Sequence, residues 1–216
     1  QTDPDDIDPF DRDEITRILN YPTTPTLHNL YTVMLWSGLS FHELISLAVE
    51  DLDLEKGCLF VNRSFVRDQY RVTKNRRRKR QVDLLPEVIN ALQSQIYQVK
   101  DNPKNTIAIT DRDNKKVKTQ TLTWLWYDDT LKTHFTYSQL SRRWKAHLET
   151  CGVRYRPLNN GRHTYASQVL STGAITAEWL ANQLGHTNTD MIHRHYGKFI
   201  PKDANHIIKN LANALQ

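Results

Sequence analysis

The sequence Leu184-Gly185-His186 is followed ten residues later by Tyr196, and Arg162-His163-Thr164-Tyr165 lies upstream of it. Within 35 residues the chain thus offers a guanidinium that can hold a phosphate, an imidazole that can move a proton, and a phenol. A tyrosine is a poor nucleophile toward most centres because its unperturbed pKa is near ~10. It becomes useful when its target is a phosphodiester whose charge is held by arginine and histidine. These residues therefore indicate chemistry on a phosphodiester.

The composition is that of a single globular domain. The chain has 216 residues, of which 38% are hydrophobic and 25% are charged. It contains no apolar run near the length of a membrane span and no signal-peptide pattern, so we expect a cytoplasmic protein without a membrane partner. Cys58 and Cys151 form no metal-ligand pattern, and we expect two reduced thiols and no metal.

The charge is unevenly distributed along the chain. Residues 1–14 carry seven acidic side chains and one arginine, a net charge of −6. Since the whole chain carries +5, the remainder carries +11. Seven of the ten residues from 71 to 80 are arginine or lysine. Such a clustered basic segment indicates a polyanionic partner, and nucleic acid is the usual one.

The hydrophobic pattern predicts a mostly helical α+β domain. Residues 1–10 are acidic, contain two prolines and show no hydrophobic period, so we interpret them as a linker or tail. Asp11 and Glu14 form a capping-box pattern that predicts the first helix. Further helices are expected at 30–36, 41–47, 87–99, 137–150, 162–172, 176–184, 188–196 and 203–214.

Three stretches read as strands of one small antiparallel sheet, at 58–66, 70–74 and 81–85. Val82 and Leu84 alternate with polar residues, which is typical of a strand with one buried face. Residues 101–135 are the least regular part of the chain. A short strand is expected at 107–109, and the remainder is interpreted as a loop or an insertion.

The order Arg-His-Thr, Leu-Gly-His and tyrosine near a C-terminus resembles the tyrosine recombinases, the phage integrase family. Residues 36–44, Trp-Ser-Gly-Leu-Ser-Phe-His-Glu-Leu, look like the first box of that family. The resemblance covers roughly residues 11–210. It implies that residues 11–216 form the catalytic domain of a bacterial or phage-encoded integrase. It also implies that the N-terminal DNA-binding domains of the parent protein are absent from this chain.

The resemblance implies a mechanism for DNA integration and recombination. Tyr196 would attack the scissile phosphate of double-stranded DNA and form a 3′-phosphotyrosyl link. Arg162, His186 and Asn159 would hold its oxygens, and Lys74 would protonate the departing 5′ oxygen. The covalent link conserves the bond energy, so no cofactor is expected. Family members act as homotetramers on two duplexes, whereas an isolated fragment could be a monomer. Residues 203–214 would either exchange between protomers or pack on their own domain.

Two positions depart from the family pattern. The first catalytic arginine is replaced by Ser40, and Asn159 stands where a histidine is usual. Losing a preorganised charged donor can cost ~3–4 kcal/mol in the transition state. Another arginine could compensate, with Arg63, Arg67 and Arg71 as candidates. Alternatively the enzyme is slower, or catalysis is lost and DNA binding remains. We expect retained catalysis.

The other basic and polar residues near these motifs are expected to play supporting parts. We interpret Arg76, Arg77, Arg78, Lys79 and Arg80 as non-specific contacts to DNA phosphates, whose strength falls with salt. His163 and Thr164 are expected to be structural. Two rival functions stay open: a type IB topoisomerase, which shares this chemistry, and a catalytically impaired DNA-binding member of the family.

Overall fold

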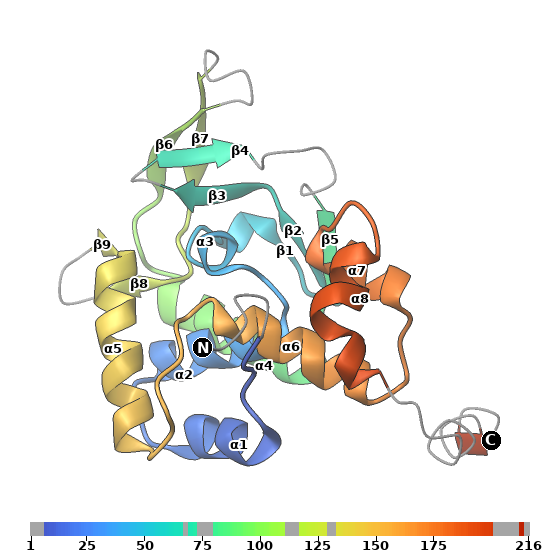
Figure 1. Cartoon of the computed structure of the whole chain (residues 1–216). Helices are drawn as coiled ribbons and strands as arrows, with labels where there is room; N and C mark the ends of the chain where they lie inside the picture. Colours follow the sequence, from blue (N-terminus) through green and yellow to red (C-terminus); the bar gives the residue numbers. More distant parts are fainter. Residues whose placement is uncertain are drawn as a thin grey trace.

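The computed structural model describes residues 7–66, 69–72, 80–110, 117–128, 133–200 and 212–213. Helices form the lower part of the molecule in Figure 1, and short strands cover it on one side. The helices are α1 (Arg12–Asn20), α2 (Pro25–Trp36), α3 (Phe41–Leu44), α4 (Pro86–Val99), α5 (Tyr137–Thr150), α6 (Asn160–Ser171), α7 (Ala177–Leu184) and α8 (Asp190–Tyr196), with short 3₁₀ turns η1 (Val49–Asp51) and η3 (Gly197–Phe199). The mostly helical α+β fold is confirmed.

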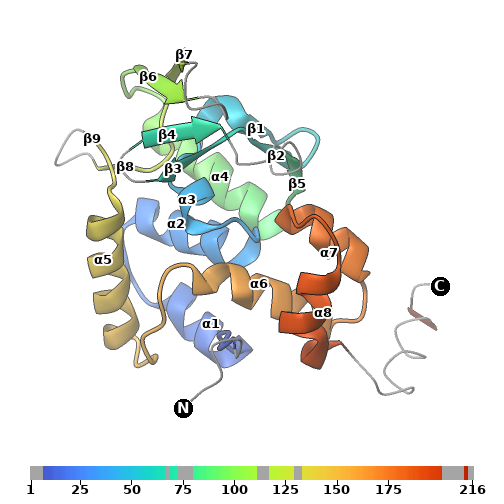
Figure 2. The same ribbon diagram turned by 45° about the horizontal axis from the view of Figure 1, so that its top comes forward.

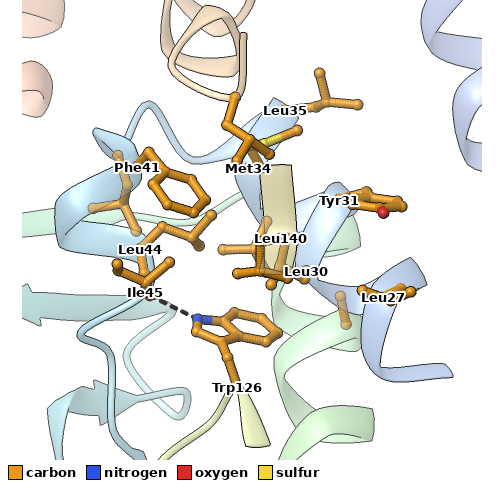
Figure 3. Close-up of a cluster of buried hydrophobic side chains, with 14 of the residues drawn as sticks. Leu27, Leu30, Tyr31, Met34, Leu35, Phe41, Leu44, Ile45, Trp126 and Leu140 are labelled. Carbon is orange, nitrogen blue, oxygen red and sulfur yellow. Dashed lines mark hydrogen bonds between the residues drawn. The ribbon is translucent and has the colours of Figure 1, made fainter. Parts of the chain in front are cut away.

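A large hydrophobic cluster joins α1 to α5 and the strands above them; we call it the first cluster. Figure 3 shows its centre, where Trp126 lies beneath side chains from α2, α3 and α5. The indole Nε1 of Trp126 donates a hydrogen bond of 2.7 Å to the carbonyl oxygen of Leu44. The polar atom of this buried ring is therefore satisfied, and the hydrogen bond ties the end of α3 to residues 124–126.

A smaller hydrophobic cluster joins α6, α7 and α8; we call it the second cluster. Both views place α7 and α8 together at one side of the molecule, next to the end of β5 (Figures 1 and 2). Many contacts between the clusters are polar. The Nε of Arg80 donates to the carbonyl oxygen of Gln183 at 2.7 Å, and the Gln183 side chain accepts from the N–H of Asp83 at 3.1 Å.

The strands form separate small sheets instead of the single one expected. The strands are β1 (Leu52–Asp53), β2 (Cys58–Val61), β3 (Arg63–Val66), β4 (Gln69–Val72), β5 (Arg80–Asp83), β6 (Asn105–Thr110), β7 (Val117–Leu122), β8 (Tyr127–Asp128) and β9 (Thr133–His134). A three-stranded antiparallel sheet is present, in the order β1-β2-β5.

The expected strand 58–66 is interrupted at Asn62, which divides it between two sheets. Its second half, β3, pairs with β4 in a four-stranded sheet of order β3-β4-β6-β7. The remainder of 101–135, interpreted as a loop or an insertion, is not a plain loop, because β6 to β9 all lie in this segment. The short strand expected at 107–109 is confirmed within β6. Polar residues on exposed strands, such as those of β7, give little hydrophobic signal.

The first helix begins as its capping pattern predicts. The N–H of Glu14 donates to the Asp11 carboxylate at 2.7 Å, and the Asp11 N–H donates to that of Glu14 at 3.0 Å. The linker interpretation fails for residues 7–10, because Phe10 is fully buried and its N–H donates to Thr164 Oγ1 at 3.0 Å. Residues 1–6, and 203–214 apart from 212–213, lie outside the described residues. In the described part of the chain, every helix is too short or too polar to cross a membrane.

Candidate active site

Arg162 lies in the first turn of α6 and is held by backbone carbonyls. Its Nη1 donates to the oxygen of Gly38 at 3.0 Å, and its Nη2 donates to that of Leu184 at 2.6 Å. Position 38 requires glycine, because its φ is +71° and a Cβ there would lie 2.6 Å from the Tyr165 ring. The guanidinium is thereby fixed at the boundary between the two clusters.

His186 follows the left-handed residue that ends α7. Gly185 has φ +73°, a conformation that glycine adopts without steric cost, and it turns the chain so that His186 faces Arg162. Arg162 Nη2 and His186 Nε2 are 3.0 Å apart. Since a guanidinium only donates, Nε2 is the acceptor in this contact. The Arg162 and His186 that the sequence singled out are therefore in contact.

Tyr196 is the last residue of α8 and is buried in the second cluster, with 2% of its surface exposed. Burial raises the pKa of its phenol to about 12, although the Arg162 charge opposes this shift. The phenol oxygen lies 2.8 Å from Nδ1 of His163. The proposed nucleophile is thus held by an imidazole and is protonated at neutral pH.

His163 makes a contact with Tyr196 that the sequence did not predict. It was expected to be structural, and no local pattern pointed to Tyr196, which is 33 residues away. The contact arises because α6 packs against α8. The other expected structural residue, Thr164, fits its interpretation: it is fully buried, and its hydroxyl donates to the Asn160 carbonyl at 2.9 Å.

Ser40 begins α3, and its N–H donates to the Glu43 carboxylate at 2.9 Å. The same carboxylate accepts two hydrogen bonds from Arg80, at 2.9 Å from Nη1 and 3.2 Å from Nη2. It also lies 3.6 Å from Nη1 of Arg162. Burial alone would raise the pKa of Glu43, but Arg80 and Arg162 beside it lower that pKa to about 2. A buried carboxylate therefore stands between two arginines, next to the position of the missing one.

The assignment of Arg80 to DNA contacts does not agree with the structure, because Arg80 is buried with 9% exposure. The first candidate for a compensating arginine, Arg63, is also placed elsewhere: it forms a buried ion pair with Asp51 at 2.5 Å. The second, Arg71, lies on β4, and its Nη2 donates to Gln69 at 2.9 Å. The side chains of Arg67, Lys74, Arg76, Arg77, Arg78 and Lys79 lie outside the described residues.

Asn159 caps the neighbouring helix α3. Its Oδ1 accepts a hydrogen bond of 3.1 Å from the N–H of Phe41, which lies in the first turn of that helix. An amide whose oxygen is engaged can still donate from its NH₂ group. It cannot take up a proton, so it cannot replace the acid–base role of a histidine. Among the described residues, no group of three histidine, cysteine, aspartate or glutamate side chains is arranged to hold a metal ion.

Comparisons with known sequences identify relatives of the chain. Residues 8–199 match the family model described as the phage integrase family. The prophage integrase IntR of Escherichia coli strain K12 is 30% identical over 198 residues, which cover 89% of this chain and 48% of IntR. IntQ of the same strain, which is described as a defective protein, is 29% identical over 205 residues, or 92% of this chain and 51% of IntQ. The chain thus spans about half the length of these relatives.

Solved structures share the fold. The integrase of transposon Tn1549 in complex with circular intermediate DNA has a TM-score of 0.71 at 17% identity, over 100% of this chain and 69% of that one. The catalytic domain of bacteriophage HP1 integrase has a TM-score of 0.58 at 18% identity, over 98% of this chain and 100% of that one.

Proposed function

Because the chain belongs to the phage integrase family, we propose that it acts in site-specific DNA recombination, cutting and rejoining strands through a 3′-phosphotyrosyl link on Tyr196. The observation that carries this proposal is that two neighbouring residues of α6 contact His186, just after α7, and Tyr196 of α8. Arg162 contacts His186 at 3.0 Å, and His163, the neighbour of Arg162, contacts Tyr196 at 2.8 Å. A cation, two imidazoles and a phenol in this arrangement suit attack on a phosphodiester.

Each group has a role in this reaction. The planar guanidinium of Arg162 would exchange its carbonyl partners for two oxygens of the scissile phosphate. His186 would donate to the same phosphate, and the NH₂ group of Asn159 would add a further donor. Lys74 is the proposed acid for the leaving 5′ oxygen, on sequence grounds alone. The covalent link preserves the energy of the broken bond, so the proposal needs no cofactor.

Arg80 is our candidate for compensating the loss at Ser40. By engaging the Glu43 carboxylate with both Nη atoms, it limits how far that carboxylate neutralises Arg162. Arg80 would therefore act by keeping the charge of Arg162 available to the phosphate. We prefer Arg80 to Arg63 and Arg71, whose side chains have other partners, whereas Arg67 lies outside the described residues.

Double-stranded DNA is the proposed substrate, since the chain outside residues 1–14 is strongly basic. The Tn1549 integrase, which has the same fold, was solved with circular intermediate DNA. A homotetramer on two duplexes and a cytoplasmic location in a bacterium are proposed with it.

A DNA-binding protein without catalytic activity is the second candidate. Ser40 favours it, because one of two cationic donors of the family pattern is absent, and the relative IntQ is described as defective. A type IB topoisomerase would relax supercoiled DNA as a monomer, which a relaxation assay would detect.

The decisive experiment traps the covalent intermediate. The intact protein is incubated with its attachment DNA carrying a nick beside the scissile phosphate, so that the cleaved strand diffuses away and religation fails. We expect a protein–DNA adduct that survives denaturing electrophoresis with wild type and is absent with Tyr196→Phe. DNA binding without an adduct would favour the inert alternative, and an adduct with Tyr196→Phe would exclude Tyr196 as the nucleophile.

A further inference from the structure

The phenol of Tyr196 must lose its proton when its oxygen bonds to phosphorus. At neutral pH the phenol is almost entirely protonated, since burial raises its pKa to about 12. A group in contact with the hydroxyl therefore has to accept the proton during the attack. The described residue whose ring nitrogen lies within hydrogen-bond distance of the phenol oxygen is His163, at 2.8 Å.

The neighbouring candidates are less suited to this task. Asn159 occupies the position of the usual histidine, and an amide has no basic nitrogen. His186 directs its Nε2 toward Arg162, which donates to it at 3.0 Å. His163 differs from both residues, because its Nδ1 lies beside the phenol oxygen. When Nε2 carries the ring hydrogen, Nδ1 can accept the phenolic proton.

We propose, on the basis of the proposed function, that His163 is the general base that accepts the proton of Tyr196 during DNA cleavage. The Tyr196 oxygen forms a bond to phosphorus while the bond from phosphorus to the 5′ oxygen breaks. The phenolic proton moves to His163 Nδ1, and the leaving oxygen takes a proton from a separate acid, for which Lys74 is our candidate. When a 5′ hydroxyl attacks the phosphotyrosine, it gives its proton to the acid that was deprotonated in the first step, and His163 returns its proton to the departing phenol oxygen.

The surroundings of His163 keep it neutral and open to proton exchange. Burial lowers the pKa of His163, and the charges of Arg162 and His195 lower it further. A cavity of about 300 Å³ borders His163 on α6. Its other lining residues include the titratable groups Asp8, Arg154, Tyr155 and Arg156, and η3, which also packs on α6, carries Lys198. Asp8 is paired with Arg154 and Arg156.

The test measures single-turnover adduct formation by the intact protein on the nicked DNA between pH 5.5 and 9.5. His163→Asn keeps an oxygen near the place of Nδ1 but cannot bind a proton. We expect the wild-type rate to fall only at low pH, as His163 becomes protonated. We expect His163→Asn to be slower by about 10²–10⁴-fold at pH 7. The rate of adduct formation by His163→Asn should rise nearly tenfold per pH unit, because without a base this rate depends on the fraction of Tyr196 that is already ionised.

Two further measurements separate proton transfer from a structural role. Added imidazole should restore part of the activity of His163→Ala, with a rate that follows the imidazole base concentration. A substrate with sulfur in place of the bridging 5′ oxygen has a leaving group that needs no proton, so it should rescue Lys74→Gln and leave His163→Asn slow. DNA binding and thermal unfolding of each variant confirm that it is folded.

The outcomes distinguish this inference from the proposed function. If wild type forms the adduct and the pH profile of His163→Asn runs parallel to it, His163 is not the base, whereas the recombinase function stands. If wild type binds its DNA and forms no adduct, the proposed function fails and this inference fails with it.

Discussion

Replacing Arg80 by leucine would leave Glu43 buried without its main partner. The two side chains of this ion pair are 6% and 7% exposed, and both Nη atoms of Arg80 donate to the carboxylate. Breaking a buried pair by removing one partner costs about 3–5 kcal/mol when the remaining charge is left uncompensated, and Arg162 at 3.6 Å places the expected cost at the lower end of this range. Arg80→Leu should therefore lower the free energy of unfolding by about that amount.

The lowered pKa of Glu43, to which Arg80, Arg162 and the N–H of Ser40 all contribute, gives the pH dependence to expect. The ordinary value is 4.5 and the value in the fold is about 2. At about 1.4 kcal/mol per unit, this depression corresponds to ~3 kcal/mol of stability at neutral pH. Because the pKa is lowered in the folded state, this contribution is complete above the unfolded value of 4.5. It is lost as the pH falls toward about 2.

The assay is urea-induced unfolding followed by tryptophan fluorescence and circular dichroism from pH 3 to pH 7. The difference between wild type and Arg80→Leu should be largest above about pH 5 and should shrink below pH 4. Adding Glu43→Gln to Arg80→Leu should recover part of the loss, because the unpaired charge is then removed. The reasoning would be refuted if Arg80→Leu lowered the free energy of unfolding by less than about 1 kcal/mol, or by an amount that did not change with pH.

Arg63→Leu is the matched control, since Arg63 and Asp51 form an equally buried ion pair, with side chains 2% and 3% exposed. Both variants should be destabilised. Among molecules that remain folded, adduct formation should fall with Arg80→Leu only, because Glu43 is then free to neutralise Arg162 at 3.6 Å. Equal losses of adduct in the two variants would exclude a specific role for Arg80.

Three further predictions concern other parts of the chain. Phe10→Ala should cost about 3–5 kcal/mol in thermal unfolding, since Phe10 is fully buried, and an unchanged Tm would contradict its place in the domain. Gly185→Ala should cost about 1–2 kcal/mol in urea unfolding, because its φ is +73° and a Cβ would meet Arg80 at 3.0 Å. Arg77→Gln should reduce the salt dependence of DNA affinity by about 0.9 in the log–log slope if Arg77 contacts one phosphate, and an unchanged slope would exclude that contact.

Local signals allowed much of the helical framework to be predicted from the sequence. The capping box of Asp11 and Glu14, Pro86 at the start of α4 and Gly185 at the end of α7 each depend on neighbours within four residues. The division of the strands between sheets was not predictable in this way. It depends on the interruption at Asn62 and on pairing between β4 and β6, whose residues are far apart along the chain.

The burial of Arg80 was not predicted, for a related reason. Arg80 ends a run of basic residues and looks like its neighbours, so it was assigned to DNA contacts. The alternation of β5 does carry a signal, because Arg80 and Val82 are buried whereas Gln81 and Asp83 are exposed. Extending the buried face from Val82 by two residues would have identified Arg80 as buried. No comparable local signal marks His163, whose contact with Tyr196 arises only from the packing of α6 on α8.

The proposed active-site groups come from elements of both hydrophobic clusters. Ser40, Glu43 and Arg80 come from elements of the first cluster, whereas His163 and Tyr196 belong to α6 and α8 of the second. A small rigid shift of one cluster against the other would change how Arg80 and Glu43 meet Arg162. The same shift would leave the distance between imidazole and phenol unchanged. We therefore expect mutations at the boundary to affect the proposed phosphate binding by Arg162 more than the contact between His163 and Tyr196.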